Sequence, residues 1–161
     1  MNTQNSRGLR LTRPESFIIE HRGPNERALT FVGRKAVTYF EAQIIQKTGT
    51  ICVGYAPRNF NARRVVAWSD GTFGVETDGE MFNDGHFVER IPSFFAGDTI
   101  ACQLDRTTHT VSYYLNGTRI DYRDQHVPAD SALYPAVTLR SPGDKVEIRM
   151  GDLPRPSESW S

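Results

Sequence analysis

An arginine-rich segment with one aromatic residue stands at residues 57–64, whose sequence is PRNFNARR. Arg58, Arg63 and Arg64 surround Phe60 there, and 16 of the 19 basic residues in the chain are arginine. The planar guanidinium group binds carboxylates and backbone carbonyls through paired hydrogen bonds, and Arg beside an aromatic residue is typical of binding hot spots. The segment therefore indicates recognition of a protein ligand. The alternative is a solvated loop whose Phe60 packs back on a sheet.

Catalytic and metal-binding patterns are weaker. His86 follows Asp84 by two residues, but no nucleophile stands at a recognised motif spacing, and neither a GxxxxGK nor a GxSxG motif occurs. The stretch 78–86, DGEMFNDGH, lacks the third ligand position and the sixth-position glycine of a calcium-binding loop. We expect no catalytic residue, no metal site and no cofactor.

The two cysteines, Cys52 and Cys102, stand inside the apolar runs ICVGYA and IACQLD. Two cysteines are too few for a disulfide scaffold, and no CxxC pair or histidine partner stands at zinc-ligand spacing. We interpret them as reduced core thiols of an intracellular protein. A disulfide between them requires that their strands lie side by side.

Length and charge narrow the function classes. The chain has 161 residues, which favours one domain, and its 19 basic residues balance 19 acidic ones. Zero net charge argues against a protein that wraps nucleic acid or covers an anionic membrane. No apolar run approaches the roughly 20 residues of a membrane helix. The polar N-terminus carries no secretory signal, although a trimmed signal is an alternative.

The residue pattern predicts an all-β domain. Val, Ile, Thr and aromatic residues are abundant, and no segment keeps a 3.6-residue period for three turns. The segment 38–46 alternates apolar and polar residues, with Phe40, Ala42 and Ile44 on the buried face, and Asn116-Gly117 marks a hairpin. Met81 and Phe82 are expected to point inward from a hairpin within residues 77–86. The expected strands are 17–21, 28–32, 38–46, 50–56, 65–68, 72–76, 99–104, 111–115, 118–122, 133–139 and 144–150.

Six segments, in this order, resemble the SPRY domain of the PRY-SPRY family. They are YFEAQI (39–44), GTICVGYAP (49–57), WSDGTFG (68–74), FFAGDTIACQLD (94–105), VSYYLNG (111–117) and LYPAV (133–137). The resemblance covers residues 15–152, which leaves 1–14 as an N-terminal arm and 153–161 as a C-terminal tail. It implies a bent β-sandwich of two antiparallel sheets with little or no helix. The segment after Gly74 departs from the family pattern, and only LRLTRPESFIIEH stands where further PRY signatures are expected.

The resemblance also implies where a partner binds, because family members with known ligands use loops at one end of the sandwich. These loops precede the YFE strand, follow GYA and lie before the last strand. Two aromatic residues have alternatives: Tyr55 as a buried ring with one satisfied hydrogen bond, and Trp68 as the edge of the core. The expected partner-binding residues are Arg27, Arg34, Lys35, Tyr55, Arg58, Phe60, Arg63, Arg64, Trp68, Arg140, Ser141 and Pro142.

The expected function is therefore that of a stand-alone, non-enzymatic adaptor. It recognises a partner protein or a short, acidic or amide-rich peptide, as a cytoplasmic monomer. Two alternatives remain open: a secreted SPRY effector, with its signal removed, that binds host proteins, and a subunit of an RNA-associated complex. Asn116-Gly117-Thr118 matches a glycosylation acceptor, which the hairpin explains without sugar unless the protein is exported.

Overall fold

The computed structural model describes residues 15–123, 125–151 and 153–156. In these ranges the chain forms strands and turns and no helix, as the composition predicts. The strands are β1 (Glu15–Glu20), β2 (Leu29–Val32), β3 (Tyr39–Gln46), β4 (Ile51–Ala56), β5 (Phe73–Glu76), β6 (Glu80–Asn83), β7 (His86–Arg90), β8 (Thr99–Asp105), β9 (Thr110–Leu115), β10 (Thr118–Arg119), β11 (Gln125–His126), β12 (Tyr134–Leu139) and β13 (Lys145–Met150).

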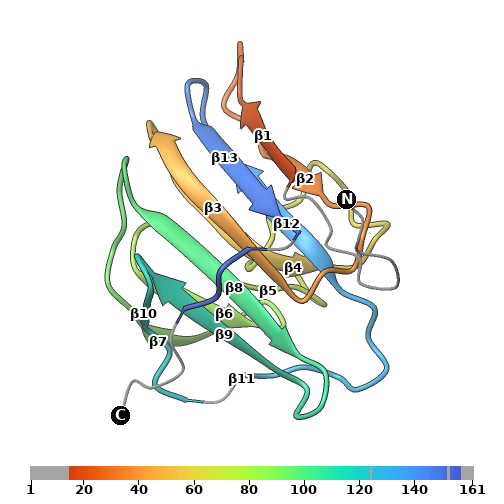
Figure 1. The fold of residues 1–161 in the computed structure, drawn as a ribbon. Coiled ribbons are helices and arrows are strands. Elements are labelled where there is room, and N and C mark those ends of the chain that lie inside the picture. The colour runs from red at the N-terminus through yellow and green to blue at the C-terminus, as the bar shows by residue number, and fades with distance from the viewer. Residues whose placement is uncertain (1–14, 124, 152, 157–161) are drawn as a thin grey trace, which may run out of the picture.

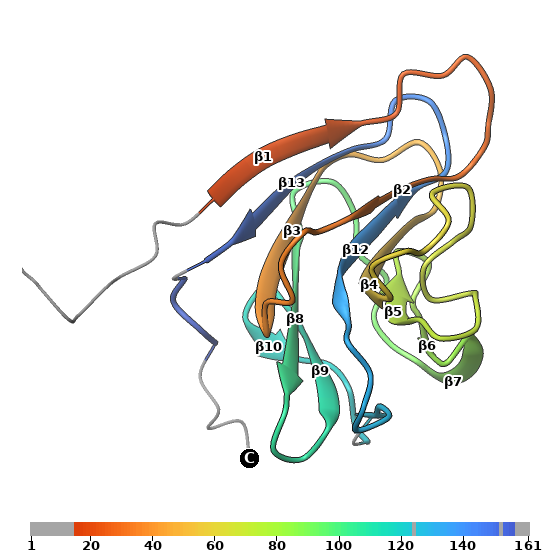
Figure 2. The same cartoon turned by 90° about the vertical axis from the view of Figure 1, so that its right-hand side faces the viewer.

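Two antiparallel sheets face each other (Figures 1 and 2). The first sheet has the order β1-β13-β3-β8-β9-β10, with β11 paired to β9, and the second has the order β2-β12-β4-β5-β6-β7. The expected antiparallel β-sandwich is confirmed. Because the sheets take strands from both halves of the sequence in alternation, loops distant in sequence meet at the ends and on the faces of the sandwich.

The core lies between the sheets and follows the period-two pattern. Phe40, Ala42 and Ile44 of β3 are fully buried, as predicted. Met81 of β6 also joins the main core, whereas Phe82 packs against a smaller cluster with Cys52 and Ala56. The expectation that Phe82 points inward is therefore wrong, because neighbouring residues of a strand face opposite sides of the sheet.

The C-terminal tail packs against the first sheet, a contact that the sequence pattern does not predict. Tyr39 stands on the polar face of β3, yet it is buried in a cluster with Ala101, Tyr114 and Leu153. The guanidinium carbon of Arg155 lies 4.6 Å from the centroid of the Tyr39 ring. The described part of the tail thus shields aromatic surface; residues 1–14 and 157–161 lie outside the described residues.

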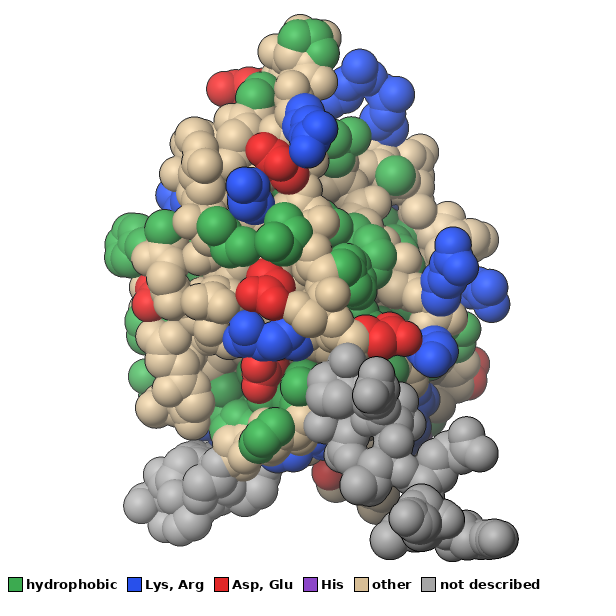
Figure 3. Space-filling view, turned by 45° about the horizontal axis from the view of Figure 1, so that its top comes forward, with side chains coloured by type: hydrophobic (Ala, Val, Ile, Leu, Met, Phe, Trp, Pro, Cys, Tyr) green, Lys and Arg blue, Asp and Glu red, His purple; other side chains and the backbone are tan. Residues whose placement is uncertain are grey.

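Charges on the outer face of the first sheet are paired rather than segregated. Arg149 of β13 lies 3.2 Å from Glu41 of β3 and 3.6 Å from Glu147, measured between side-chain nitrogen and oxygen atoms. Acidic and basic side chains accordingly lie next to one another in the space-filling view (Figure 3). Within the described residues, these pairs partly neutralise the charges of this face, which weakens its attraction for a charged ligand over a distance.

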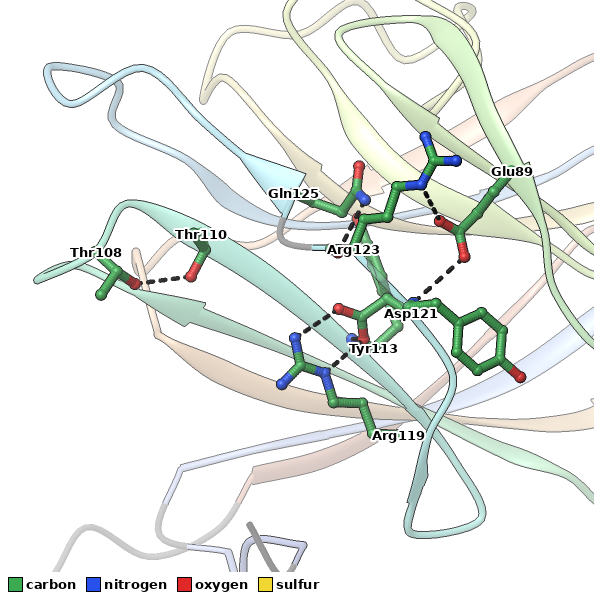
Figure 4. Close-up of polar contacts among 9 residues, drawn as sticks. Glu89, Thr108, Thr110, Tyr113, Arg119, Asp121, Arg123 and Gln125 are labelled. Atoms are coloured by element: carbon green, nitrogen blue, oxygen red, sulfur yellow. Dashed lines mark hydrogen bonds and ion pairs between the residues drawn. The ribbon is translucent and has the colours of Figure 1, made fainter. Parts of the chain in front are cut away.

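A polar cluster closes the sandwich between β9 and β7 (Figure 4). Asp121 is buried and accepts hydrogen bonds from the backbone N–H of Tyr113 at 2.9 Å and from two nitrogens of Arg119. The backbone N–H of Tyr122 donates to Glu89 of β7 at 3.3 Å. Since the Asp121 carboxylate takes the Tyr113 N–H, β10 ends at Arg119, earlier than the predicted strand 118–122.

Three local predictions need correction. Residues 65–68 form turns rather than a strand, and Ala67 there has a positive φ of 82°, which no extended strand allows. Strands β7 and β11 were not predicted. Cys52 lies in β4 of the second sheet and Cys102 in β8 of the first; both are free, so the disulfide alternative is wrong.

Candidate protein-binding face

The loop between β4 and β5, residues 57–72, crosses the outer face of the second sheet. The Ala62 carbonyl accepts the Thr30 N–H of β2 at 2.8 Å, and the Val66 N–H donates to the hydroxyl of Thr138 in β12 at 3.0 Å. The hydroxyl of Thr72 accepts the Ala67 N–H at 2.9 Å. These contacts attach the loop to two strands of the sheet, so it presents its outward side chains from a fixed backbone.

Phe60 anchors the first half of this loop. It is half-buried and packs on the cluster of Cys52, Ala56 and Ala136. The guanidinium carbon of Arg64 lies 5.9 Å from the Phe60 ring centroid, while Arg58, Arg63 and Arg64 are exposed. Phe60 therefore packs back on the sheet, as the alternative expects, while the three arginines face solvent. Recognition of a ligand by these arginines stays a prediction.

Trp68, in the second half of the loop, contacts both Arg140 and Glu76. Its indole N–H donates to the Glu76 carboxylate at 2.6 Å, and the Arg140 guanidinium carbon lies 4.8 Å from the ring centroid. Trp68 remains 37% exposed, so it is not a core residue. An aromatic ring with a stacked guanidinium group offers a ligand both apolar and hydrogen-bonding surface.

Glu76 is buried, and its environment changes its acidity. Burial, together with the neighbouring carboxyl of Glu80, raises the pKa of Glu76 to about 7, although the Trp68 hydrogen bond acts in the opposite direction. The charge of the carboxyl that accepts the Trp68 indole N–H therefore changes near neutral pH. Glu76 is the last residue of β5, and its side chain is on the outer face of the sheet. The alternation of the strand does not distinguish such a position from an ordinary surface glutamate.

The turn 140–143 owes its shape to Asp144. This buried carboxylate accepts backbone N–H bonds from Thr48 at 2.7 Å, Gly49 at 3.0 Å, Arg140 at 3.2 Å and Ser141 at 3.0 Å. Sequence reasoning missed both Asp144 and Glu76. The signal for Asp144 was its place after Pro142-Gly143, where a short acidic side chain commonly satisfies turn amides.

Most of the predicted residues come together on what we call the loop face, defined as residues 57–72 and 140–143. Arg27 belongs to the β1–β2 loop, which lies beside this turn, because the His21 carbonyl accepts the Gly143 N–H at 2.8 Å and the His21 ring bonds the Arg27 carbonyl at 2.8 Å. Ser141 and Pro142 are half-buried parts of the turn. A long, anchored loop and a carboxylate-braced turn thus form one continuous surface, whose exposed side chains include three arginines and Trp68 beside Asn59, Asn61 and Asp70.

Three predicted residues lie elsewhere. Tyr55 is fully buried, and its hydroxyl donates to the Cys102 carbonyl at 3.3 Å, so its assignment to the binding surface is wrong. Its side chain points into the core because Val53, Tyr55 and the other inner positions of β4 alternate with outer ones. Arg34 and Lys35 are exposed but follow the opposite end of β2, next to the β12 residue Pro135. They do not join the loop face.

Comparison with known proteins assigns the fold family. A model of the SPRY domain family matches residues 37–152. The chain belongs to the SPRY family. It is 31% identical over 120 residues to the Ran-binding proteins 9/10 homolog of Drosophila melanogaster, and 30% identical over 122 residues to human Ran-binding protein 9. Those alignments cover 72% and 73% of this SPRY chain but only 12% and 16% of the relatives, which are much longer proteins.

Solved structures agree on the SPRY fold. A human SPRY domain superposes with a TM-score of 0.71 at 21% identity, covering 81% of this chain and 89% of the other. The SPRY domain of human HERC1 gives a TM-score of 0.58, also at 21% identity, with coverage of 87% and 80%. SPRY domains are in general modules that bind protein partners.

Among the described residues, no group of three His, Cys, Asp or Glu side chains is arranged to hold a metal ion. Within the same ranges, no helix is long and apolar enough to cross a membrane.

Proposed function

We propose that this SPRY domain is a non-enzymatic adaptor that binds a segment of a partner protein on the loop face. The observation that carries the proposal is the Trp68–Arg140 pair. It brings an exposed indole and a guanidinium group from two separate loops to one point on a backbone braced by Thr138 and Asp144. A preformed surface loses little conformational entropy when it binds.

The side chains of this face favour an acidic or amide-rich ligand. Arg58, Arg63 and Arg64 are exposed, and among the described residues the Arg140 guanidinium has a ring contact but no hydrogen-bond acceptor. Guanidinium groups without acceptors gain most from carboxylates and carbonyl oxygens of a ligand. The proposed partner is therefore a protein segment with Asp, Glu, Asn or Gln, met in the cytoplasm.

The longer relatives supply context but no partner. The two relatives are named as Ran-binding proteins, and this chain covers only a small share of their length. We restrict the proposal to a protein-binding module, whose specificity depends on side chains of the loop face rather than on the shared sandwich.

The proposal is tested by affinity capture from the source cell's lysate, followed by titration of the captured partner. Arg63→Ala/Arg64→Ala removes two exposed charges from the loop face. The matched control, Arg90→Ala/Arg123→Ala, removes two exposed charges outside the loop face. We expect the first variant to lose about tenfold or more in affinity, with an unchanged melting temperature, and the control to bind like wild type.

The opposite outcomes are equally clear. Equal retention of the partner by both double variants would remove residues 63–64 from the binding site. Capture of RNA in place of protein would contradict the proposed function and favour the RNA-associated alternative.

A further inference from the structure

One long side of the sandwich is bordered by the edge strand of each sheet. β1 ends the first sheet and β2 ends the second, and both lie on the same side of the molecule (Figures 1 and 2). Phe17 of β1 and Phe31 of β2 meet across this edge, with ring centroids 5.1 Å apart and planes at 62°. The two rings bridge the sheets, and a cavity opens beside them.

We call this cavity, of about 350 Å³, the edge pocket; it is lined by Glu15, Phe17, Phe31, Gly33, Arg34, Lys35 and Met150. Its walls are apolar, because two half-buried phenylalanines and the buried Met150 form them. Its mouth is basic, because Arg34 and Lys35 are exposed. Apolar walls with a few charged groups at the mouth are the usual composition of a ligand site.

The positive charges at the mouth are poorly neutralised. Lys35 Nζ lies 3.9 Å from Glu15, and both side chains are more than half exposed, so water weakens this pair. Arg34 has no ion pair with a described residue. An anionic group that reaches the mouth would therefore meet two cations without displacing a strong internal partner.

The backbone of β1 also has an unused edge. In the described ranges β1 pairs only with β13, so one row of its N–H and C=O groups lacks a strand partner. Such an edge accepts an added extended segment through main-chain hydrogen bonds, while pockets beside it select side chains. The six residues of β1 match a segment of about six residues.

We propose that the edge pocket docks an extended segment of a partner protein, which inserts an apolar side chain against Phe17 and Phe31 and places an acidic side chain on Arg34 and Lys35. Charge complementarity favours a partner over the chain's own N-terminus. Residues 1–14 contain three arginines and no acidic residue, so they carry the same sign as the mouth.

This site is separate from the loop face. Leu29 pairs with Leu139 at one end of the β2–β12 ladder, beside Arg140, whereas Val32 pairs with Ala136 at the other end, beside Gly33. The edge pocket and the turn 140–143 are thus at opposite ends of β2, while residues 62–64 of the loop face contact Thr30 between them. Variants at Arg34 and Lys35 and variants at Arg63 and Arg64 therefore test the two proposed sites separately.

The test is a titration followed by the amide NMR signals of the full chain. The probes are the capped hexapeptide Thr-Val-Leu-Asp-Glu-Thr and its neutral counterpart Thr-Val-Leu-Asn-Gln-Thr. Each is titrated up to about 5 mM, a concentration at which a ligand with a Kd of about 5 mM is half bound. We expect the acidic peptide to shift signals of Phe17, Phe31 and residues 33–35, with about tenfold tighter binding than the neutral peptide.

Two variants complete the design. Arg34→Glu/Lys35→Glu reverses the mouth charge and is expected to abolish the shifts, whereas Arg63→Glu/Arg64→Glu on the loop face leaves them unchanged. No shift with the acidic peptide, equal binding of both peptides, or shifts confined to the loop face would each overturn the proposal. So would a change of the edge-pocket signals on deleting residues 1–13 without peptide, since the chain's own N-terminus would then occupy the pocket.

Discussion

Arg140 stacks on Trp68, with its guanidinium carbon 4.8 Å from the ring centroid, although the two residues belong to different loops. At the edge of the ring, Glu76 accepts the indole N–H at 2.6 Å. One tryptophan thus contacts the guanidinium group of Arg140 through its ring face and the buried carboxyl of Glu76 through its N–H. The proposed binding at the loop face and the protonation of Glu76 therefore involve the same tryptophan.

The stacking of Arg140 on Trp68 should be measurable as a coupling energy. We expect Trp68→Ala and Arg140→Ala to be non-additive by about 0.5–1 kcal/mol in the free energy of unfolding, because each single change already removes the cation–π contact. Urea denaturation of the two single variants and the double variant gives this value. As a control, Trp68→Ala combined with Arg106→Ala, at a distant turn, is expected to be additive.

Glu76 should make stability depend on pH near neutrality. Its folded-state pKa of about 7 exceeds the ordinary value of 4.5, so the folded protein binds a proton more tightly than the unfolded chain. The stability that this proton provides is present below pH about 4.5 and is lost as the pH rises to about 7. In Glu76→Gln the side chain is a neutral amide at every pH, like the protonated carboxyl, so this pH dependence is removed.

The comparison of wild type with Glu76→Gln isolates this group. We expect the variant to be more stable than wild type by about 1–2 kcal/mol at pH about 8, and the advantage to vanish at pH about 5. Chemical denaturation at both pH values measures the difference. A constant difference across this range would show that Glu76 does not titrate there.

Asp144 should determine the shape of the turn 140–143. Asp144→Asn replaces a carboxylate that accepts four backbone N–H bonds, and we expect a loss of about 2–4 kcal/mol in the free energy of unfolding. Amide NMR shifts should concentrate at residues 48–49 and 140–143. Asp130→Asn, at an exposed position, serves as the control and is expected to change neither quantity.

The buried ion pair at Asp121 should matter more than an exposed one. Asp121→Asn breaks the pair with Arg119, whose side chain is only 14% exposed, and is expected to cost about 3 kcal/mol. Arg90→Ala breaks the pair with Glu80, in which Arg90 is 70% exposed, and is expected to cost less than about 0.5 kcal/mol. Similar losses in thermal denaturation would contradict the structural role of the Asp121 cluster.

The two thiols should be inert in the folded protein. Burial raises the pKa of both Cys52 and Cys102, which keeps them in the unreactive thiol form. We expect neither to react with a thiol reagent such as 5,5′-dithiobis(2-nitrobenzoate) under native conditions, and both to react at once in guanidinium chloride. Rapid native labelling of either residue would show that its strand opens.

The sequence by itself determined the fold class and most strands. Alternation at Phe40, Ala42 and Ile44, the Asn116-Gly117 turn and six ordered segments are local patterns, and a strand buried on one face must show them in its own residues. The arginine-rich segment around Phe60 was also visible, because its composition departs from that of a strand.

Only the tertiary structure decided which residues share a surface. Tyr55 and Trp68 are both aromatic residues near one loop, yet the first is buried and the second meets Arg140. Arg34 lines the same pocket as Phe17, because it follows the Val32 end of β2, whereas Arg64 contacts Thr30 within that strand. Such neighbours depend on strand order and register, which arise from pairing between distant segments and leave no periodic signal within either one.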